Sequence, residues 1–368
     1  MSDAELITSP LHDRHEALGA KFAEFGGWSM PVEYVGVLKE HAAVRERVGI
    51  FDVSHLGKLV VKGDGAEEFL NRCLSNDLGK IAKGKAQYTL CCDPQTGGVI
   101  DDLIVYLKDD DHLLLVPNAA NSAQVQAMLQ AEKPEGVQIT DHHQSHAVLA
   151  VQGTKSDEVL TSLGLPVGHD YMSFVEVPFE GASVVVCRTG YTGERGYELV
   201  IDAGAAGALW DALLEAGEQF EMLPCGLGAR DTLRTEMGYP LHGQDLSPQI
   251  TPNQAGLGWA VGWKKDAFWG KDALVAEKEE GTRVALRGLT SNGRAIARPG
   301  MNVLMARDLP VGTVTSGTFS PTLRQGIALA LINKQIQIGA EVLVDVRGKP
   351  EIFTVTKPPF VQTQVRES

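Results

Sequence analysis

The chain has 368 residues, of which 43% are hydrophobic, and its formal charge is −14 at pH 7. This length predicts two or three domains, and the hydrophobic fraction is large enough to supply a core for each of them. The acidic balance argues against nucleic acid or an anionic membrane as the main partner.

Up to about residue 280, strand-like segments alternate with amphipathic helices. An early helix carries His41 on its apolar side and ends near Gly49. The expected elements that follow are a helix near 66–75 with a capping box from Asp64 and Glu67, a hairpin around 95, a strand over 112–117, a helix over 121–131, a strand over 147–151, a helix near 156–163, strands around 183 and 198, and a helix that carries Leu209, Trp210, Leu213 and Leu214. Hairpins mixed with helices predict an α+β fold and not a doubly wound parallel sheet.

From about residue 282 the pattern changes to short strands separated by Gly or Pro turns. The strand-like runs are RVALRGLT, MNVLM, VGTVTSG, IALALI, EVLVDVRG and EIFTVTK. Strands at this spacing predict a small C-terminal β-barrel or jelly-roll domain.

The stretch GGVIDDLIVYL, residues 97–107, places two acids in an apolar strand. Successive strand side chains point to opposite faces, so Asp101 and Asp102 lie on different faces of the strand. Both faces are largely apolar, and burying a carboxylate costs several kcal/mol unless something offsets it. At least one of these acids is therefore expected to have a partner or a function that offsets its burial.

Two further stretches carry candidate polar groups. In TGYTGERGYELVI (189–201) the glycines shape a tight loop before a strand, and Glu198 is either a solvated residue or a pocket residue. In GLGARDTLRTEMGYPLHGQD (226–245) a helix is expected near 229–237. Arg230 and Arg234 lie four apart on it, which suits a buried acid or an anionic ligand, although Arg234 also fits an ordinary surface position.

Other classes of site and location are less favoured. The five cysteines lack a C-x-x-C pair and the histidines lack an H-E-x-x-H pattern, so free structural thiols and no metal site are expected. No run reaches the roughly 18 apolar residues of a membrane span. Residues 1–19 lack a signal or transit pattern, and a cytoplasmic protein is expected.

Taken together, these motifs resemble the glycine cleavage T-protein family, the tetrahydrofolate-dependent aminomethyltransferases. The matching stretches, in the family's order, are FGGWSMP (25–31), GIFDVSH (49–55), GGVIDDLIVY, TGYTGERGYE, GLGARDTLR, SGTFSPTL (316–323) and KPPF (357–360). The resemblance implies a three-domain cloverleaf around a central folate pocket. Its approximate parts would be 1–52 plus 146–226, then 53–145 plus 227–281, and a C-terminal barrel over 282–368.

The resemblance also implies the reaction and its partners. The lipoyl arm of H-protein would deliver an aminomethyl group, tetrahydrofolate would accept the methylene as cosubstrate, and ammonia would leave, without a metal. Asp101 matches the family's essential aspartate near the reacting folate nitrogens. The carboxylate of Asp102 would be satisfied by the backbone or a helix end.

The resemblance also implies a set of folate-binding residues. Glu198 matches the pterin-binding glutamate, because a carboxylate suits the planar two-donor edge of the pterin. Tyr191 and Arg230 match pocket residues, and Arg230 would orient the acids or contact folate. Asn118 also matches a pocket residue, and Arg298 is a candidate for binding the folate glutamate tail.

Two alternative functions use the same scaffold. One is a folate-dependent demethylase of a small methylated compound. The other is a non-enzymatic folate-binding factor for iron–sulfur assembly, a branch that carries K-G-C-Y-x-G-Q-E where this chain has residues 237–245 without the cysteine.

Overall fold

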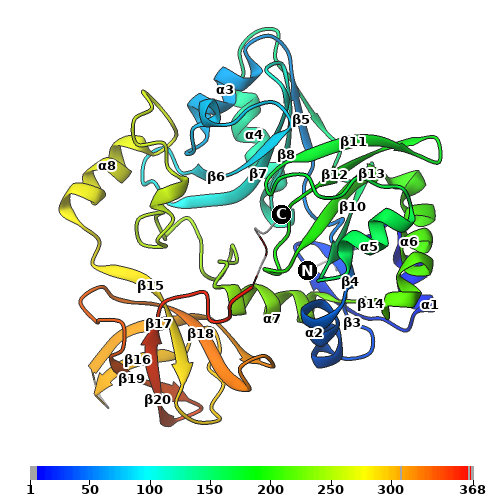
Figure 1. The fold of residues 1–368 in the computed structure, drawn as a ribbon. Coiled ribbons are helices and arrows are strands. Elements are labelled where there is room, and N and C mark those ends of the chain that lie inside the picture. Colours follow the sequence, from blue (N-terminus) through cyan, green and yellow to red (C-terminus); the bar gives the residue numbers. More distant parts are fainter. Residues whose placement is uncertain (1–5, 307–308, 364, 366–368) are drawn as a thin grey trace.

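The computed structural model describes residues 6–306, 309–363 and 365. The fold is α+β, as the sequence predicts, and its strands form a three-stranded, a five-stranded and a six-stranded sheet and a closed barrel. Figure 1 shows these parts as lobes around a shared centre, with the barrel at the lower left. Residues 1–5 and 366–368, at the ends of the predicted first and third parts, lie outside the described residues.

The six-stranded sheet joins distant stretches of the chain in the order β11-β12-β13-β10-β4-β14. Its strands are β4 (Gly49–Asp52), β10 (His146–Gln152), β11 (Phe174–Phe179), β12 (Ala182–Cys187), β13 (Gly196–Asp202) and β14 (Leu223–Pro224). Alternate residues such as Leu149 and Leu199 share a core with Trp210 of α6 (Ala203–Gly217) and Leu160 of α5 (Ser156–Ser162). All six strands fall within 1–52 and 146–226.

A smaller unit precedes this sheet. It consists of α1 (His12–Ala17) and a sheet of order β1-β3-β2, with β1 (Ile7–Thr8), β2 (Lys21–Phe25) and β3 (Trp28–Glu33). Helix α2 (Val37–Glu46) then leads into β4. His41 is buried on α2, as its place on the apolar side predicts.

The five-stranded sheet has the order β6-β7-β8-β5-β9. Its strands are β5 (Leu59–Lys62), β6 (Lys85–Cys92), β7 (Val99–Asp109), β8 (His112–Val116) and β9 (Gln138–Asp141), with helices α3 (Ala66–Cys73) and α4 (Ser122–Glu132). Leu103 and Val105 pack with these helices, whereas Tyr106 and Leu114 share a core with Val148 and Val200 of the six-stranded sheet. The two large sheets therefore pack face to face.

One local prediction in this lobe is wrong. Helix α3 begins at Ala66 after Gly65, and no side-chain cap forms there. Gly65 takes the left-handed φ of 78° that glycine tolerates, so the backbone turn displaces the capping box expected from Asp64 and Glu67.

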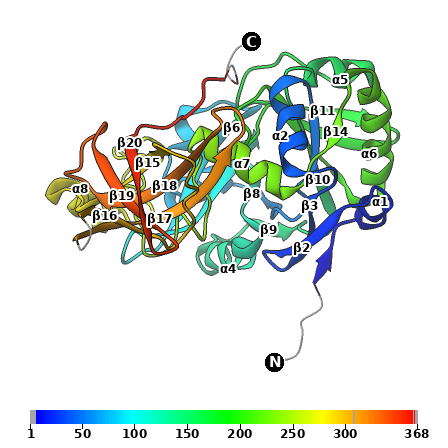
Figure 2. The same cartoon turned by 90° about the horizontal axis from the view of Figure 1, so that it is seen from below.

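The C-terminal strands close into a barrel of order β15-β18-β17-β16-β19-β20, which confirms the predicted β-barrel. They are β15 (Val284–Ser291), β16 (Asn302–Ala306), β17 (Leu309–Ser320), β18 (Gln325–Asn333), β19 (Glu341–Val346) and β20 (Lys349–Thr356). Helix α8 (Lys271–Glu280) precedes the barrel, and single turns of 3-10 helix lie at Leu78–Lys80, Ala119–Asn121, Glu218–Phe220 and Gly258–Ala260. Figure 2 shows the barrel at one side, away from α6.

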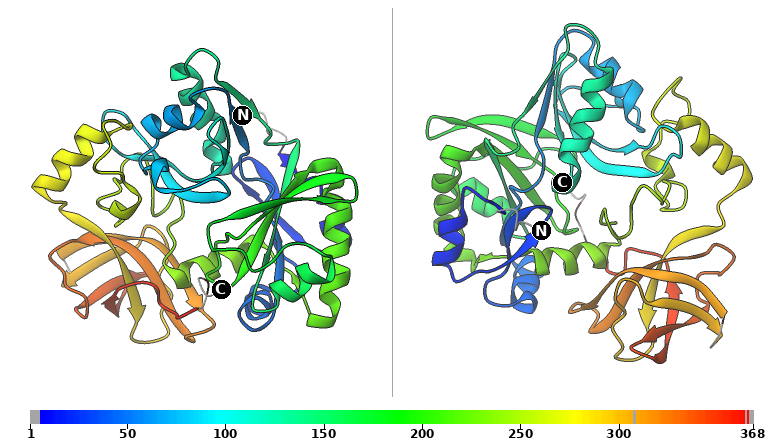
Figure 3. Two further views of the ribbon diagram at one scale, coloured as in Figure 1. Left: turned by 45° about the horizontal axis from the view of Figure 1, so that its top comes forward. Right: turned by 180° about the vertical axis from the view of Figure 1, so that it is seen from behind.

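Helix α7 (Leu227–Met237) crosses the junction of the lobes. It contacts α2, β3 and the barrel strand β17, and Figure 3 shows it between the barrel and the six-stranded lobe. It ends at Gly238, where φ is 67° and a side chain would collide with Pro358 of the C-terminal segment. The short helix is therefore held between the lobes at both its side and its end.

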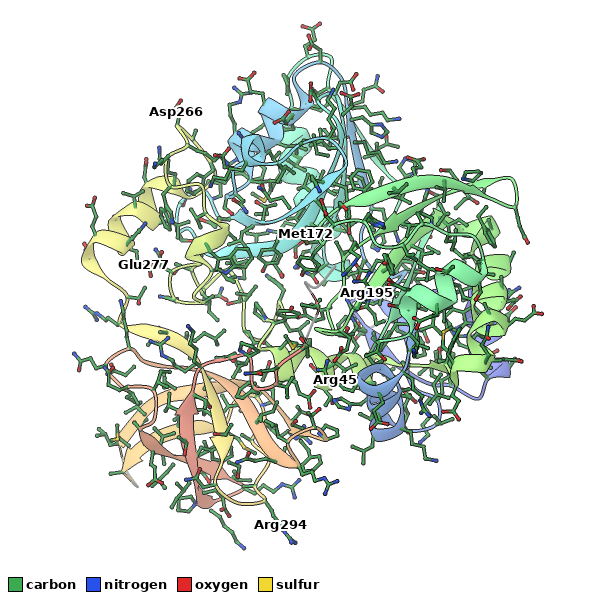
Figure 4. All side chains as sticks on the ribbon, viewed as in Figure 1. Arg45, Met172, Arg195, Asp266, Glu277 and Arg294 are labelled. Carbon is green, nitrogen blue, oxygen red and sulfur yellow. The ribbon has the colours of Figure 1, made fainter. Side chains whose placement is uncertain are left out.

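Two buried polar clusters fix α7 at this junction. The carboxylate of Glu236 accepts bonds from His41 at 2.9 Å, from Arg45 at 2.8 Å and from Ser320 of the barrel. Figure 4 places Arg45 beside α7 at the base of the six-stranded lobe. Two residues earlier on α7, Arg234 donates to Asp245 at 2.7 Å and to Ser316 of the barrel at 2.8 Å.

We expect Asp245→Asn to lower the free energy of unfolding by about 3 to 5 kcal/mol, because it leaves the guanidinium of Arg234 without its buried partner. Urea unfolding monitored by circular dichroism measures this loss. The matched control is Asp231→Asn, which removes the half-exposed partner of the same guanidinium and should cost about 1 kcal/mol or less. Equal losses for the two variants would contradict a central role for the Arg234–Asp245 pair.

Candidate functional site

A cavity of about 660 Å³ lies where the lobes meet. Four of the predicted site residues line it, namely Asn118, Tyr191, Glu198 and Arg230, and so does Asp102. Met172, labelled in Figure 4 between the two large sheets, is also part of its wall. This volume is typical of a site for a small organic ligand.

Asp101 lies behind the cavity wall. Its carboxylate has no exposed surface and is not among the groups that line the cavity. The backbone N–H of Asn118 donates to it at 3.0 Å, the Asn118 side-chain amide at 2.9 Å and the Asn121 amide at 2.7 Å. Each of these donors is neutral and lies just before α4.

Asp102 borders the cavity itself. Its carboxylate accepts from the hydroxyl of Tyr88 at 3.0 Å and from the amide of Asn118 at 2.9 Å. Strand alternation does send the two acids to opposite faces, but the face of Asp102 is the one that adjoins the cavity. The expectation that Asp102 would be satisfied by the backbone or a helix end is therefore wrong.

The two acids form a connected pair with little compensating charge. Asn118 donates to both carboxylates, and within the described residues neither forms an ion pair with Lys, Arg or His. Burial raises the pKa of both carboxyls, and repulsion from Asp102 adds to the increase at Asp101. A pair of this kind favours a ligand that carries positive charge.

A second polar group lies on strand β13 of the other large sheet. Glu198 is 9% exposed, and its carboxylate accepts a hydrogen bond from Thr189 at 2.6 Å. The hydroxyl of Tyr106 lies 3.1 Å from that of Thr189, so β7 and β13 both support this end of the cavity. The hydrogen bonds from Tyr106 to Thr189 and from Thr189 to Glu198 fix the orientation of the Glu198 carboxylate.

Arg230 contributes a guanidinium without a protein acceptor at one of its nitrogens. Nη1 is buried and forms no hydrogen bond with the described residues, while the guanidinium carbon lies 4.8 Å from the centre of the Tyr191 ring. Burial lowers the pKa of Arg230, and the nearby Glu198 opposes that change. The Tyr191 hydroxyl donates to the carbonyl of Pro240, which holds the ring under the guanidinium.

The cavity also contains groups that the sequence patterns did not single out. Tyr88 stacks on Trp259 at 5.3 Å between ring centres, and Trp259 is 66% exposed. The imidazole of His55, in the GIFDVSH motif, has a pKa lowered to about 3 by burial and by Arg230, so it is neutral at pH 7. Only the tertiary fold brings these separate segments together; His55 lies in a matching motif that assigned it no role, and no local pattern marks Tyr88 or Trp259.

Arg298 does not join the others. It lies on the barrel, donates to the carbonyl of Gly317 at 3.0 Å and is not part of the cavity wall. The five cysteines are free and buried, as predicted. Over residues 6–306 and 309–363, no helix has both the length and the apolar character needed to cross a membrane.

Comparisons with known proteins match almost the whole chain. The family described as the GCVT N-terminal domain matches residues 11–265, and the glycine cleavage T-protein C-terminal barrel domain matches 284–362. An aminomethyltransferase of Frankia alni is 61% identical, covering 99% of this chain and all of that protein, and one of Mycolicibacterium paratuberculosis is 58% identical over similar coverage.

A solved structure is similar over nearly its full length. The glycine cleavage system aminomethyltransferase T of Bartonella henselae superposes with a TM-score of 0.91 at 35% identity, covering 97% of this chain and 98% of that one.

The acid pair predicts how stability depends on pH. Since burial raises the folded-state pKa of Asp102, its ionisation is costlier in the folded chain, and its stabilising contribution is present below about pH 4 and lost as the pH rises through the folded pKa. We therefore expect the stability of Asp102→Asn relative to the original chain to increase as the pH rises from 4 to 8. Urea unfolding at both pH values measures this.

Asp266→Asn is the control, because this carboxylate, labelled in Figure 4, is exposed and is not part of the cavity wall. It should show no such change with pH. A stability difference for Asp102→Asn that is the same at pH 4 and pH 8 would contradict the raised pKa.

Proposed function

Because the chain belongs to the glycine cleavage T-protein family and is an aminomethyltransferase of the glycine cleavage system, we propose that its central cavity binds tetrahydrofolate between Glu198 and the Asp101–Asp102 pair. The observation that carries the proposal is that one cavity has an oriented carboxylate at one side and an uncompensated acid pair at another.

Glu198 suits the pterin end of tetrahydrofolate. The pterin presents N3–H and a 2-amino group side by side, and the two oxygens of a fixed carboxylate can accept from both. Thr189 holds the Glu198 carboxylate from behind. Arg230 leaves a buried N–H without a protein acceptor, which is the kind of orphan donor that a bound oxygen or nitrogen acceptor satisfies.

The acid pair suits the reacting end. In the proposed reaction the aminomethyl carbon breaks its bond to the lipoyl sulfur and forms bonds to N5 and N10 of tetrahydrofolate, while ammonia leaves. The two protons lost from N5 and N10 balance those gained by the thiolate and the ammonia. Positive charge develops on the aminomethyl group, and a carboxylate without a protein cation stabilises it more than one that is already paired.

Within the pair, we assign the direct contact to Asp102 and a supporting role to Asp101. Asp102 faces the cavity, whereas Asp101 acts through the shared Asn118 amide. The sequence resemblance assigns the essential role to Asp101, so both acids remain in the proposal and the two variants below distinguish them.

The same proposal includes the partner and the surroundings. Lipoylated H-protein would deliver the aminomethyl group, tetrahydrofolate would serve as cosubstrate without a metal, and the cytoplasm would be the compartment. Arg298, on the barrel, remains a proposed contact for a glutamate tail that extends out of the cavity. The demethylase and iron–sulfur assembly alternatives are not favoured, because relatives at 58–61% identity over the whole chain are named aminomethyltransferases.

The function is tested with purified protein, aminomethyl-lipoyl H-protein and tetrahydrofolate. Release of ammonia that requires both substrates is expected. If ammonia were not released, but methylated donors produced methylfolate, the demethylase alternative would replace the proposal.

Glu198→Gln should weaken tetrahydrofolate binding about ten- to a hundredfold, because an amide must turn one N–H toward the two-donor pterin edge and loses a charge-assisted bond of roughly 1.5 to 3 kcal/mol. Calorimetric titration measures the affinity. Glu194→Gln is the control, since Glu194 pairs with Arg45 outside the cavity. Unchanged affinity in Glu198→Gln would remove this residue from the pterin site.

Asp102→Asn should lower turnover by about a hundredfold or more while tetrahydrofolate still binds, which is the scale for loss of an electrostatic or acid–base group. Asp101→Asn should lower turnover less, because it acts on the reacting group only through Asn118. Single-turnover ammonia release compares the two variants. If Asp101→Asn abolished turnover and Asp102→Asn preserved it, the roles within the pair would be reversed.

A further inference from the structure

His242 lies in the loop that follows α7 and forms part of the cavity wall. Its Nε2 is 3.0 Å from the backbone carbonyl of Val99, and a carbonyl can only accept, so Nε2 carries a proton. Its Nδ1 is 2.9 Å from the amide nitrogen of Asn121, and an amide nitrogen can only donate, so Nδ1 carries a lone pair. These two contacts define one neutral tautomer.

The Asn121 amide links this imidazole to the acid pair. Its nitrogen is 2.9 Å from His242 Nδ1 and 2.7 Å from Asp101 Oδ1, so its two N–H groups are directed to the two acceptors. Reversing the amide would place its oxygen against a carboxylate oxygen and an imidazole lone pair, which both accept. Neutral His242 and ionised Asp101 therefore hold Asn121 in the same orientation.

We propose that His242 is a positioning residue for the transfer reaction, which it supports by holding the Asn121 amide in the orientation that donates to Asp101. The inference rests on the proposed function of the acid pair, but the hydrogen-bond relay itself can be measured without turnover.

The relay depends on the protonation state of His242. A protonated His242 carries a hydrogen on Nδ1 and can no longer accept from Asn121. The amide must then release the ring or reverse, and a reversed amide presents an oxygen that suits a protonated Asp101. Protonation of His242 therefore breaks the contact that orients the Asn121 amide toward Asp101.

The surroundings of the ring are consistent with this link. Titratable or charged side chains near the loop include Asp101 and Asp102 on β7, Tyr88 on β6, Tyr191, and Arg230, Asp231 and Arg234 on α7, with Tyr239 and Asp245 in the loop itself. Arg234 is already paired with Asp231 and Asp245, so the charge closest to the relay is that of the two acids.

The first experiment follows the tautomer directly. In full-length protein labelled with 15N-histidine and assigned with His242→Gln, the Nδ1 resonance of His242 at pH 8 should be that of an unprotonated nitrogen and Nε2 that of an N–H. Asn121→Ala removes the donor to Nδ1, so the preference for the Nε2–H tautomer at pH 8 should weaken and the Nδ1 resonance should shift. An Nδ1–H tautomer at pH 8 in the original chain, or ring resonances that are the same in Asn121→Ala, would overturn the inference.

The second experiment compares how turnover depends on pH. His242→Gln can offer an oxygen to Asn121 and an N–H to Val99, but it cannot be protonated. The decrease of kcat at acidic pH should therefore occur at a pH lower by about half a unit or more than in the original chain. His242→Phe offers neither group, and kcat at pH 8 should fall about tenfold, while KM for tetrahydrofolate changes by less than about threefold. His112→Gln, on β8 outside the cavity, should leave the profile unchanged.

The two experiments separate the inference from the proposed function. If the NMR results hold but neither Asp101→Asn nor Asp102→Asn lowers turnover, the relay exists and the assignment of the acid pair is wrong. If Asp101→Asn or Asp102→Asn lowers turnover, but kcat of His242→Gln decreases at the same acidic pH as that of the original chain, the assignment of the acid pair is supported and the role of His242 is overturned.

Discussion

The arrangement of this protein depends on one buried ion pair at the junction of its lobes. Arg234 and Asp245 are 2.7 Å apart and almost completely buried, and both also contact Ser316 of the barrel. Burying two charges is favourable only when their remaining donors and acceptors are satisfied, and here the helix, the following loop and the barrel all supply partners. The pair therefore holds the loop that carries His242 against the cavity.

The acid pair on β7, unlike the Arg234–Asp245 pair, has no partner of opposite charge among the described residues. Asp101 and Asp102 are bonded only to amides and hydroxyls, and their pKa values are raised by burial. The protein therefore satisfies their hydrogen bonds but leaves their charge uncompensated. This arrangement reduces stability at neutral pH and is useful when a cationic group forms in the cavity, so stability and chemistry place opposing demands on the same strand.

The packing of the two large sheets explains why these groups face one cavity. Tyr106 of β7 packs with Val148 and Val200 of the six-stranded sheet, so the next residues along this face of β7 are directed toward β13. Asp102 lies on that face and Glu198 lies on β13. A small change in how the sheets pack would therefore move both ends of the site.

The sequence by itself determined the local elements, since periodicity of two or about 3.6 residues identifies strands and helices from neighbouring residues alone. It predicted the barrel strands, the helix that carries Arg230 and the presence of two acids on opposite faces of β7, and its motifs pointed to the correct family. Only the tertiary structure decided that the face of Asp102 borders the cavity, that Arg298 lies outside it, and that Asn121 and His242 meet. Alternation along a strand fixes which residues share a face, but the elements that cover each face come from distant parts of the chain, so their contacts leave no local pattern in the sequence.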